Sequence, residues 1–312
     1  MTDYNVMIVT LARAAGENAN YTPGEDGVNP EQDLNQADPL GLSDTERAII
    51  DEAVNAKKEN NGKLIVMLNN ASAMEIEEIK NNTGVDAILE VGLPGGYGFY
   101  GVADVLSGEV NPSGHMPVSV PAFREQIISD ENFAEQTEQV TYREGMFMGY
   151  RGYETKKIPV QFPFGFGLSY TTFEITECSV EQEKITDCEK TVLRGKIKNT
   201  GNRKGAQVVQ LYVKNPRAWK ARPARELRDF QKIILEAGEE KEFVFSISRE
   251  LFELYDERVD ERTVPQGMYG LELGFSVQDI RASQKIEVTP VFPVPKQIQG
   301  WDKTERLLET KA

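Results

Sequence analysis

The chain has 312 residues, of which 39% are hydrophobic and 27% are charged. Since domains of ~100 to 200 residues are typical, this length predicts about two domains, each large enough for its own core. The 35 Lys and Arg against 50 Asp and Glu give a net charge of −15, which argues against nucleic acid and anionic membranes as partners. No apolar run approaches the ~20 residues that cross a bilayer, and no basic leader follows Met1. We therefore expect a soluble, cytoplasmic protein.

Histidine and cysteine are scarce. The single histidine, His115, excludes any zinc site or acid–base scheme that needs two histidines, so catalysis would fall to carboxylate, hydroxyl, Tyr or Lys groups. His115 lies in a turn rich in Pro and Gly, where a structural or exposed role is favoured over sugar binding. The sequence shows no export signal. We therefore expect Cys178 and Cys188 to be free thiols rather than a disulfide.

The first part of the chain alternates strand and helix patterns. Short apolar runs predict buried strands, and helical spacing of apolar residues predicts helices between them. Ser43 and Glu46 form a capping box that marks the start of the first helix. The expected strands are 6–11, 64–68 and 87–91, and the expected helices are 43–60, 73–80 and 99–106.

This order of elements predicts a parallel sheet with helices on both faces. Three strands make a thin sheet, because sheets average ~5 to 6 strands. We therefore expect an α/β unit that is incomplete at its amino end, with a sheet edge or apolar face for another segment to cover.

From residue 171 onward the pattern has period two. Apolar and polar residues alternate in four runs, around 193–198, 209–213, 243–248 and 269–275, with turn residues between them. This is typical of an antiparallel β-sandwich.

Three motifs carry a family resemblance. They are Asn-Pro-Ser-Gly-His-Met-Pro at 111–117, Tyr-Arg-Glu-Gly-Met-Phe-Met-Gly-Tyr-Arg at 142–151, and Phe-Pro-Phe-Gly-Phe-Gly-Leu-Ser-Tyr-Thr-Thr-Phe at 162–173. In this order they resemble the signatures of glycoside hydrolase family 3, the β-glucosidase and β-xylosidase group. Segments 199–201, 205–213, 223–227 and 267–269 are similar to the family's fibronectin type III-like domain.

The resemblance implies a fold of α/β plus all-β class. We expect a partial three-layer parallel α/β sandwich followed by an immunoglobulin-like, fibronectin type III-like β-sandwich. The expected domains are 1–122 for the α/β part, 123–170 for an aromatic connector, 171–290 for the β-sandwich and 291–312 for a tail.

The resemblance also implies a function. The chain resembles the carboxyl-terminal part of a retaining, exo-acting β-glycosidase that hydrolyses terminal β-linked sugars without a metal or cofactor. Family members carry the aspartate nucleophile on a barrel of ~250 residues, which we expect to be missing here. The implied partners are a β-glycoside or oligosaccharide and the barrel, or a subunit carrying it. The alternative is a non-catalytic structural or carbohydrate-interaction module left from such an enzyme.

Glu17 is the one catalytic candidate. The segment 12–18, Ala-Arg-Ala-Ala-Gly-Glu-Asn, resembles the family loop whose glutamate is the general acid/base. Glu17 also lies just past the carboxyl end of the first expected strand, where parallel sheets present ligand sites. Read from the residues alone, a solvated loop acid is the favoured interpretation, and the catalytic role is what the resemblance implies. We predict no metal site and assign no substrate-binding residues.

The connector is unusually aromatic. A sugar-stacking platform and packing between domains both account for such a density, and packing is favoured. The residues concerned are Tyr142, Tyr150, Tyr153, Phe164, Phe166 and Tyr170.

Overall fold

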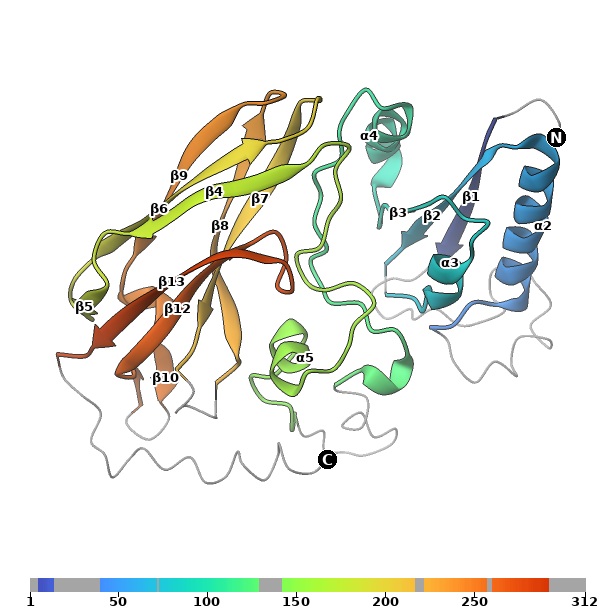
Figure 1. The fold of residues 1–312 in the computed structure, drawn as a ribbon. Helices are drawn as coiled ribbons and strands as arrows, with labels where there is room; N and C mark the ends of the chain where they lie inside the picture. Colours follow the sequence, from blue (N-terminus) through green and yellow to red (C-terminus); the bar gives the residue numbers. More distant parts are fainter. Residues whose placement is uncertain are drawn as a thin grey trace. The chain divides into compact units, whose positions relative to one another are not determined.

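The computed structural model describes residues 5–13, 40–71, 73–128, 142–216, 222–256 and 260–291. Contacts within the chain divide it into two compact units, which are described separately below (Figure 1). An α/β unit comprises Met1–Val110 and Val120–Ile127, and a β-sandwich unit comprises Asn111–Ser119 and Ile128–Ala312. The expected fold class is confirmed. The predicted domain limits at 122, 170 and 290 stay predictions.

The α/β unit contains a three-stranded parallel sheet in the order β1-β2-β3. Its strands are β1 (Val6–Arg13), β2 (Lys63–Asn70) and β3 (Ala87–Glu90). Val9, Val66 and Ile88 are aligned across the three strands. Each strand forms from one of the apolar runs found in the sequence, which confirms the predicted strands and their parallel pairing.

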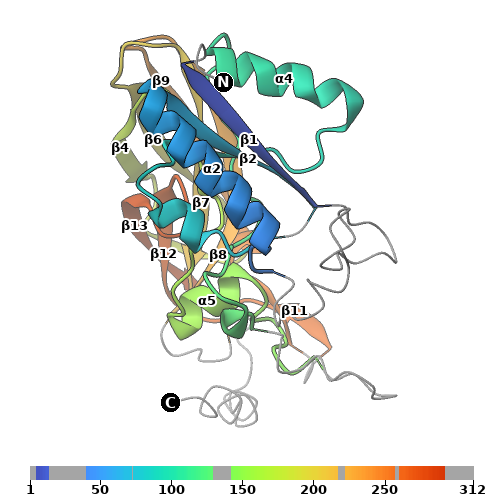
Figure 2. The same cartoon turned by 90° about the vertical axis from the view of Figure 1, so that its right-hand side faces the viewer.

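Helix α2 (Asp44–Asn60) packs on β1 and β2 (Figure 2). Its first turn is held by the predicted capping box: the Glu46 N–H donates to Ser43 Oγ (3.1 Å), and the Ser43 N–H donates to Glu46 Oε2 (2.8 Å). Ile50 and Val54 are buried, whereas Ile49, which the helical spacing places on the same face, is 46% exposed. The helix ends at Asn61, whose left-handed conformation (φ 51°) terminates the hydrogen-bond series.

The other two helices of this unit differ in length from the prediction. Helix α3 (Glu77–Asn81) is shorter than the expected 73–80, although Met74 and Ile76 are buried before it begins. The Glu75 N–H donates to the Leu40 carbonyl oxygen (2.9 Å), so the backbone there bonds to another segment rather than forming a helix. Helix α4 (Gly95–Ser107) begins earlier than the expected 99–106 despite its glycine-rich first turn.

Part of the apolar surface of this unit is exposed. On β1, Val6 and Ile8 are 50% and 47% exposed, and on α4, Tyr97 and Tyr100 are 88% and 72% exposed. None of the side chains of α4 is buried, although most of its residues are apolar. The unit therefore presents an apolar helix and one open face of an edge strand.

The second unit is built around two sheets that pack face to face. One sheet has the order β5-β13-β12-β7-β8 and the other has the order β4-β6-β9, with β10 and β11 forming a separate pair. The strands are β4 (Phe173–Val180), β5 (Lys184–Thr186), β6 (Thr191–Asn199), β7 (Gly205–Lys214), β8 (Arg225–Leu235), β9 (Glu240–Ile247), β10 (Leu254–Asp256), β11 (Glu261–Thr263), β12 (Gly267–Gly274) and β13 (Ile280–Thr289). Short helices are η1 (Arg124–Gln126), in the α/β unit, and α5 (Tyr150–Lys156) and η3 (Arg249–Leu251).

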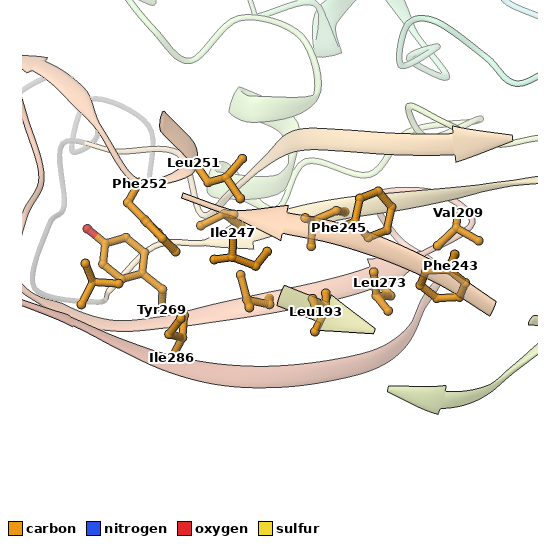
Figure 3. Close-up of a cluster of buried hydrophobic side chains, with 14 of the residues drawn as sticks. Leu193, Val209, Phe243, Phe245, Ile247, Leu251, Phe252, Tyr269, Leu273 and Ile286 are labelled. Carbon is orange, nitrogen blue, oxygen red and sulfur yellow. The ribbon is translucent and has the colours of Figure 1, made fainter. Parts of the chain in front are cut away.

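The core of the sandwich lies between these sheets (Figure 3). The predicted alternation is confirmed on the inner faces, because every second residue of the strands is buried there. The core includes Leu193, Ile197, Val209, Leu211, Val213, Phe243, Phe245, Ile247, Tyr269, Leu271 and Ile286.

The outer face of the five-stranded sheet departs from the predicted alternation. Gln210 and Tyr212 of β7 alternate with the core residues of that strand, yet Gln210 is 3% exposed and Tyr212 is fully buried. Residues 111–119 and 142–170, called the covering segments below, pack over this face. The Tyr150 ring stacks on Phe164 at 4.4 Å and meets the Tyr212 ring edge-on at 6.5 Å.

One amide group fixes the covering segments to the sheet. Gln210 Nε2 donates to the carbonyl oxygens of Gly165 (3.1 Å) and Phe275 (2.7 Å), and Gln210 Oε1 accepts from the Tyr212 hydroxyl (2.5 Å). Gly165 has φ +79°, and a Cβ atom there would lie 2.1 Å from Gln210 Oε1. Only glycine therefore allows this approach.

We predict that Gln210→Ala destabilises the sandwich unit by about 2 to 4 kcal/mol, because the Tyr212 hydroxyl and the Phe275 carbonyl would lose a buried partner. Amide hydrogen exchange of β7 and β12 measures this loss. Gln231→Ala is the control, since Gln231 makes one exposed hydrogen bond, to the Val244 carbonyl oxygen. Equal protection in the two variants would contradict the prediction.

A second prediction concerns Asp86, at the entry to β3. Its carboxylate accepts from Lys57 Nζ (2.5 Å), Lys63 Nζ (2.9 Å) and the Leu64 N–H (2.8 Å), and these donors hold its pKa far below the ordinary value. A lowered pKa stabilises the fold above the ordinary value of about 4, and this contribution is lost as the pH falls through the lowered pKa. Asp86→Asn should therefore lower the free energy of unfolding at pH 7, and the difference from wild type should shrink below about pH 4.

Urea unfolding at pH 7, 5 and 3 checks the Asp86 prediction. The matched control is Asp51→Asn, an exposed position on α2. A difference between wild type and Asp86→Asn that stays constant down to pH 3 would show that the lysine contacts contribute nothing.

Candidate functional site

The carboxyl ends of β1, β2 and β3 lie at one edge of the parallel sheet. The last residues of these strands are Arg13, Asn70 and Glu90. Open parallel sheets bind ligands at this edge, where the loops that follow the strands gather. It is therefore the candidate site, and its polar groups are described first.

Arg13 is a buried cation at this edge, with a side chain only 5% exposed. Its guanidinium group forks onto the Glu46 carboxylate, with Nε donating to Oε1 (3.0 Å) and Nη2 donating to Oε2 (2.6 Å). Nη2 also donates to the Gly41 carbonyl oxygen (2.6 Å), and Nη1 donates to that of Leu40 (3.4 Å). The last residue of β1 is thus bonded to the chain that leads into α2.

Glu46 connects this pair to the start of the helix. Besides the two bonds from Arg13, its carboxylate accepts the N–H of Ser43 in the capping box. The Glu46 side chain is 8% exposed, so the charge is paired and its oxygens are bonded away from water. One carboxylate therefore fixes the end of a strand and the start of a helix.

The ends of β2 and β3 add further polar groups. Asn69 Nδ2 donates to the Gly92 carbonyl oxygen (2.5 Å), and the Gly92 N–H donates to Glu90 Oε1 (2.9 Å). Neighbouring atoms desolvate the Glu90 carboxyl group, which raises its pKa. The bond from the Gly92 N–H offsets part of this rise in pKa. The residue as a whole is exposed. Asn70 is 5% exposed. The edge is polar across all three strands.

Glu17, the predicted acid/base, lies outside the described residues, and its role stays a prediction. The structure does fix Arg13, four positions before it. In the sequence, Glu46 is recognisable only as a capping residue, and its pairing with Arg13 was not predicted. The available signal was Arg13 itself, a charged residue at the end of an otherwise apolar strand. A charged side chain that is buried needs a partner.

The aromatic residues of the connector mostly pack within the sandwich unit. Tyr150 and Phe164 stack, Phe166 lies 5.2 Å from Phe162, and Tyr153 is 6% exposed. Tyr142 and Tyr170 are 71% and 48% exposed. The Tyr170 ring lies beneath the guanidinium of Arg203 at 5.3 Å. Packing within this unit thus accounts for four of the six aromatic residues, and packing between domains stays a prediction.

His115 and the two cysteines lie in the sandwich unit. His115 Nδ1 lies 2.6 Å from the Gly165 carbonyl oxygen, so this nitrogen carries the proton and donates it. Cys178 is half-buried and Cys188 exposed, and both are free thiols. Burial raises the pKa of Cys178, which keeps it in the thiol form.

Two other kinds of site are not found in the described part of the chain. Among those residues, no three or more His, Cys, Asp or Glu side chains are grouped to hold a metal ion. No helix there is both long and apolar enough to cross a bilayer.

Sequence models of two families match the chain. The glycosyl hydrolase family 3 C-terminal domain matches residues 1–170, which is more than half of the chain. The fibronectin type III-like domain matches residues 207–277, within the sandwich unit. The first match includes the ends of all three parallel strands and the segment with Glu17.

Curated relatives and solved structures agree with these matches. Thermostable beta-glucosidase B of Acetivibrio thermocellus is 36% identical over 245 residues, covering 78% of this chain and 32% of the relative. An exo-alpha-(1->6)-L-arabinopyranosidase of Bifidobacterium breve is 34% identical over 249 residues, covering 80% and 31%. The chain thus spans about a third of the length of these relatives.

Two solved structures are similar to this chain in fold. The GH3 beta-glucosidase of Bifidobacterium adolescentis superposes with a TM-score of 0.74 at 30% identity, covering 93% of this chain and 40% of that one. Beta-glucosidase 3B of Thermotoga neapolitana, in complex with alpha-D-glucose, gives 0.76 at 30% identity, covering 91% and 38%.

We predict that Glu46→Ala lowers the stability of the α/β unit by about 3 to 5 kcal/mol, because Arg13 would be left as an unpaired buried cation. Amide hydrogen exchange of β1 and α2 measures the opening free energy of this unit. The control is Glu78→Ala, which removes a similar fork from Arg47 at a site where the side chains are 39% and 59% exposed. It should cost about 0.5 kcal/mol. Equal losses would show that burial adds nothing to the Arg13 pair.

Proposed function

The chain belongs to glycoside hydrolase family 3, and on this premise we propose that it forms the carboxyl-terminal part of a retaining, exo-acting β-glycosidase of β-glucosidase type. The observation that carries the proposal is the 36% identity with a thermostable beta-glucosidase over 78% of this chain. The family match extends through the candidate sheet edge and through Glu17. The chain would supply one half of a catalytic site.

In this proposal Glu17 is the general acid/base. Retaining hydrolysis needs two carboxyl groups ~5 to 5.5 Å apart. One forms a bond to the anomeric carbon as the bond to the leaving oxygen breaks, and the other donates a proton to that oxygen. Glu17 would donate this proton and then take one from the water that releases the sugar. The aspartate nucleophile would come from a barrel outside this chain.

The barrel, or a subunit that carries it, is therefore the proposed partner. The exposed apolar residues of the α/β unit support this, since Val6 and Ile8 on β1 and Tyr97 and Tyr100 on α4 would gain from being covered. Three parallel strands with an open edge also favour an additional segment beside them.

We also propose that the barrel determines which sugar is hydrolysed. Relatives named for beta-glucosidase and for arabinopyranosidase activity match this chain at 36% and 34% identity over similar lengths. The part of those enzymes that resembles this chain thus serves different sugars. The shared element would be proton transfer, and the specific sugar contacts would lie mainly in the barrel.

We predict that the chain has negligible turnover alone and hydrolyses aryl β-glucosides once combined with the barrel portion. In that complex, Glu17→Gln should lower kcat/KM for a phenyl glucoside by about 10² to 10⁴-fold, because the poor leaving group needs a proton. A dinitrophenyl glucoside should be affected far less, since its leaving group departs unprotonated. Steady-state kinetics on both substrates measure the effect.

Glu25→Gln is the matched control, a second glutamate in the same segment. Full activity of Glu17→Gln on the phenyl glucoside would remove its assigned role. No hydrolysis by the wild-type complex would instead support the non-catalytic module, and sugar binding that survives Glu17→Gln would identify its function.

A further inference from the structure

Three arginine side chains of the sandwich unit surround one carboxylate. On β8, the Glu226 carboxylate accepts hydrogen bonds from Arg222 Nη2 (2.9 Å) and Arg228 Nη2 (3.0 Å). Arg151 of α5 lies beside its other oxygen, with Nε 3.6 Å from Oε1. We propose that these four residues, called the arginine cluster below, bind a small oxyanion such as inorganic phosphate or sulfate.

The arginine cluster has three positive charges against one negative charge. The side chains of Arg222, Arg228 and Glu226 are 3%, 22% and 11% exposed. In the part of the chain that the structure describes, Glu226 is the one carboxylate within 4 Å of the three guanidinium groups. Burial lowers the pKa of Arg222 in spite of the adjacent carboxylate. Because shielded charges need partners of opposite sign, the excess of positive charge favours an anion.

The neighbouring charged residues do not balance this excess. Arg225 Nε lies 3.1 Å from Glu272 Oε2, and Lys214 Nζ lies 3.6 Å from Glu272 Oε1. Glu154 Oε2 lies 4.0 Å from Arg225 Nη1, and Glu154 Oε1 accepts a hydrogen bond from Gln278 Nε2 (2.9 Å). These two carboxylates are matched by two cations of their own. Neither carboxylate is therefore left to neutralise the arginine cluster.

Two guanidinium groups of the cluster have unused hydrogen-bond donors. Arg151 and Arg228 each carry five N–H donors. Of all these donors, only Arg228 Nη2 donates a hydrogen bond to a described residue, and its acceptor is Glu226. Both Nε atoms are shielded from solvent and have no hydrogen-bond partner there. Buried donors are normally paired, so these two groups point to a bound ion or an ordered water.

An oxyanion accounts for both the charge and the donors, whereas water accounts only for the donors. The planar guanidinium group presents pairs of N–H groups whose spacing matches two oxygens of a phosphate or sulfate. The Arg151 side chain is 42% exposed, so an ion reaches it from solvent. Arg228 approaches the same carboxylate from β8, on which α5 packs. One bound oxyanion would therefore join α5 to β8 and stabilise the sandwich unit.

Arg194, in the same unit, provides a matched control. Its Nε (2.9 Å) and Nη2 (2.8 Å) both approach Glu181 Oε1, so one arginine faces one carboxylate. The two side chains are 54% and 50% exposed. Arg194→Gln therefore removes one positive charge from the sandwich unit without changing the arginine cluster.

The experiment uses the full chain. Wild type, Arg151→Gln, Arg228→Gln and Arg194→Gln are titrated at pH 7 with sodium phosphate and, separately, with sodium sulfate, while sodium chloride holds the ionic strength constant. Sodium chloride alone is a further titration. Arginine Nε–H resonances, assigned by their loss in the variants, report binding at the cluster. Amide hydrogen exchange of α5 and β8 reports the stability of the sandwich unit.

We expect phosphate and sulfate to shift the Nε–H resonances of Arg151 and Arg228 with a dissociation constant of about 1 mM. At about 10 mM oxyanion, the unfolding constant of the sandwich unit should then fall about tenfold. Arg151→Gln and Arg228→Gln should each weaken binding by about tenfold or more, because each removes charge-assisted hydrogen bonds to the ion. Arg194→Gln should bind the oxyanions as wild type does.

Three results would overturn the proposal. Chloride might shift the resonances as strongly as the oxyanions, which would show general screening. Stabilisation that persists in both cluster variants would reflect the exclusion of phosphate and sulfate from protein surfaces in general. Nε–H resonances that stay unchanged up to about 10 mM oxyanion would assign the unpaired donors to ordered water. Either cluster variant suffices if the other fails to fold, and no outcome depends on the role of Glu17.

Discussion

The Glu46 carboxylate is the constraint on which the α/β unit depends. It accepts two bonds from Arg13 and one from the Ser43 N–H, so it joins the end of β1 to the first turn of α2. These elements are 33 residues apart in sequence. The Leu40 and Gly41 carbonyls are held through the same guanidinium group. Without this carboxylate, the strand end, the helix start and residues 40–41 would lose their common anchor.

The sandwich unit uses a comparable device with neutral groups. Gln210 is buried on the outer face of β7 and fixes Gly165 and Phe275, two residues from segments distant in sequence. In both units a polar side chain at a strand holds irregular backbone in one place. A buried amide or ion pair specifies one arrangement because any other leaves a donor or acceptor unpaired, at a cost of about 1 to 3 kcal/mol per group.

The sequence predicted what depends on near neighbours. The three parallel strands, the capping box at Ser43 and the alternating strands follow from unbroken apolar runs, a spacing of three residues and an alternation of two. The burial of Gln210 and Tyr212 could not be predicted this way, because it depends on residues 111–119 and 142–170 covering that face. The length of α3 was also wrong, since a bond from Glu75 to Leu40 competes with helix formation there.

The same distinction between local pattern and folded structure applies to the candidate site. The resemblance identified Glu17 from a local motif, whereas the Arg13 and Glu46 pair appears only when the fold brings the two residues together. Arg13 stood inside that motif without an assigned role, because a one-dimensional pattern does not show which carboxylate a strand-end arginine will face.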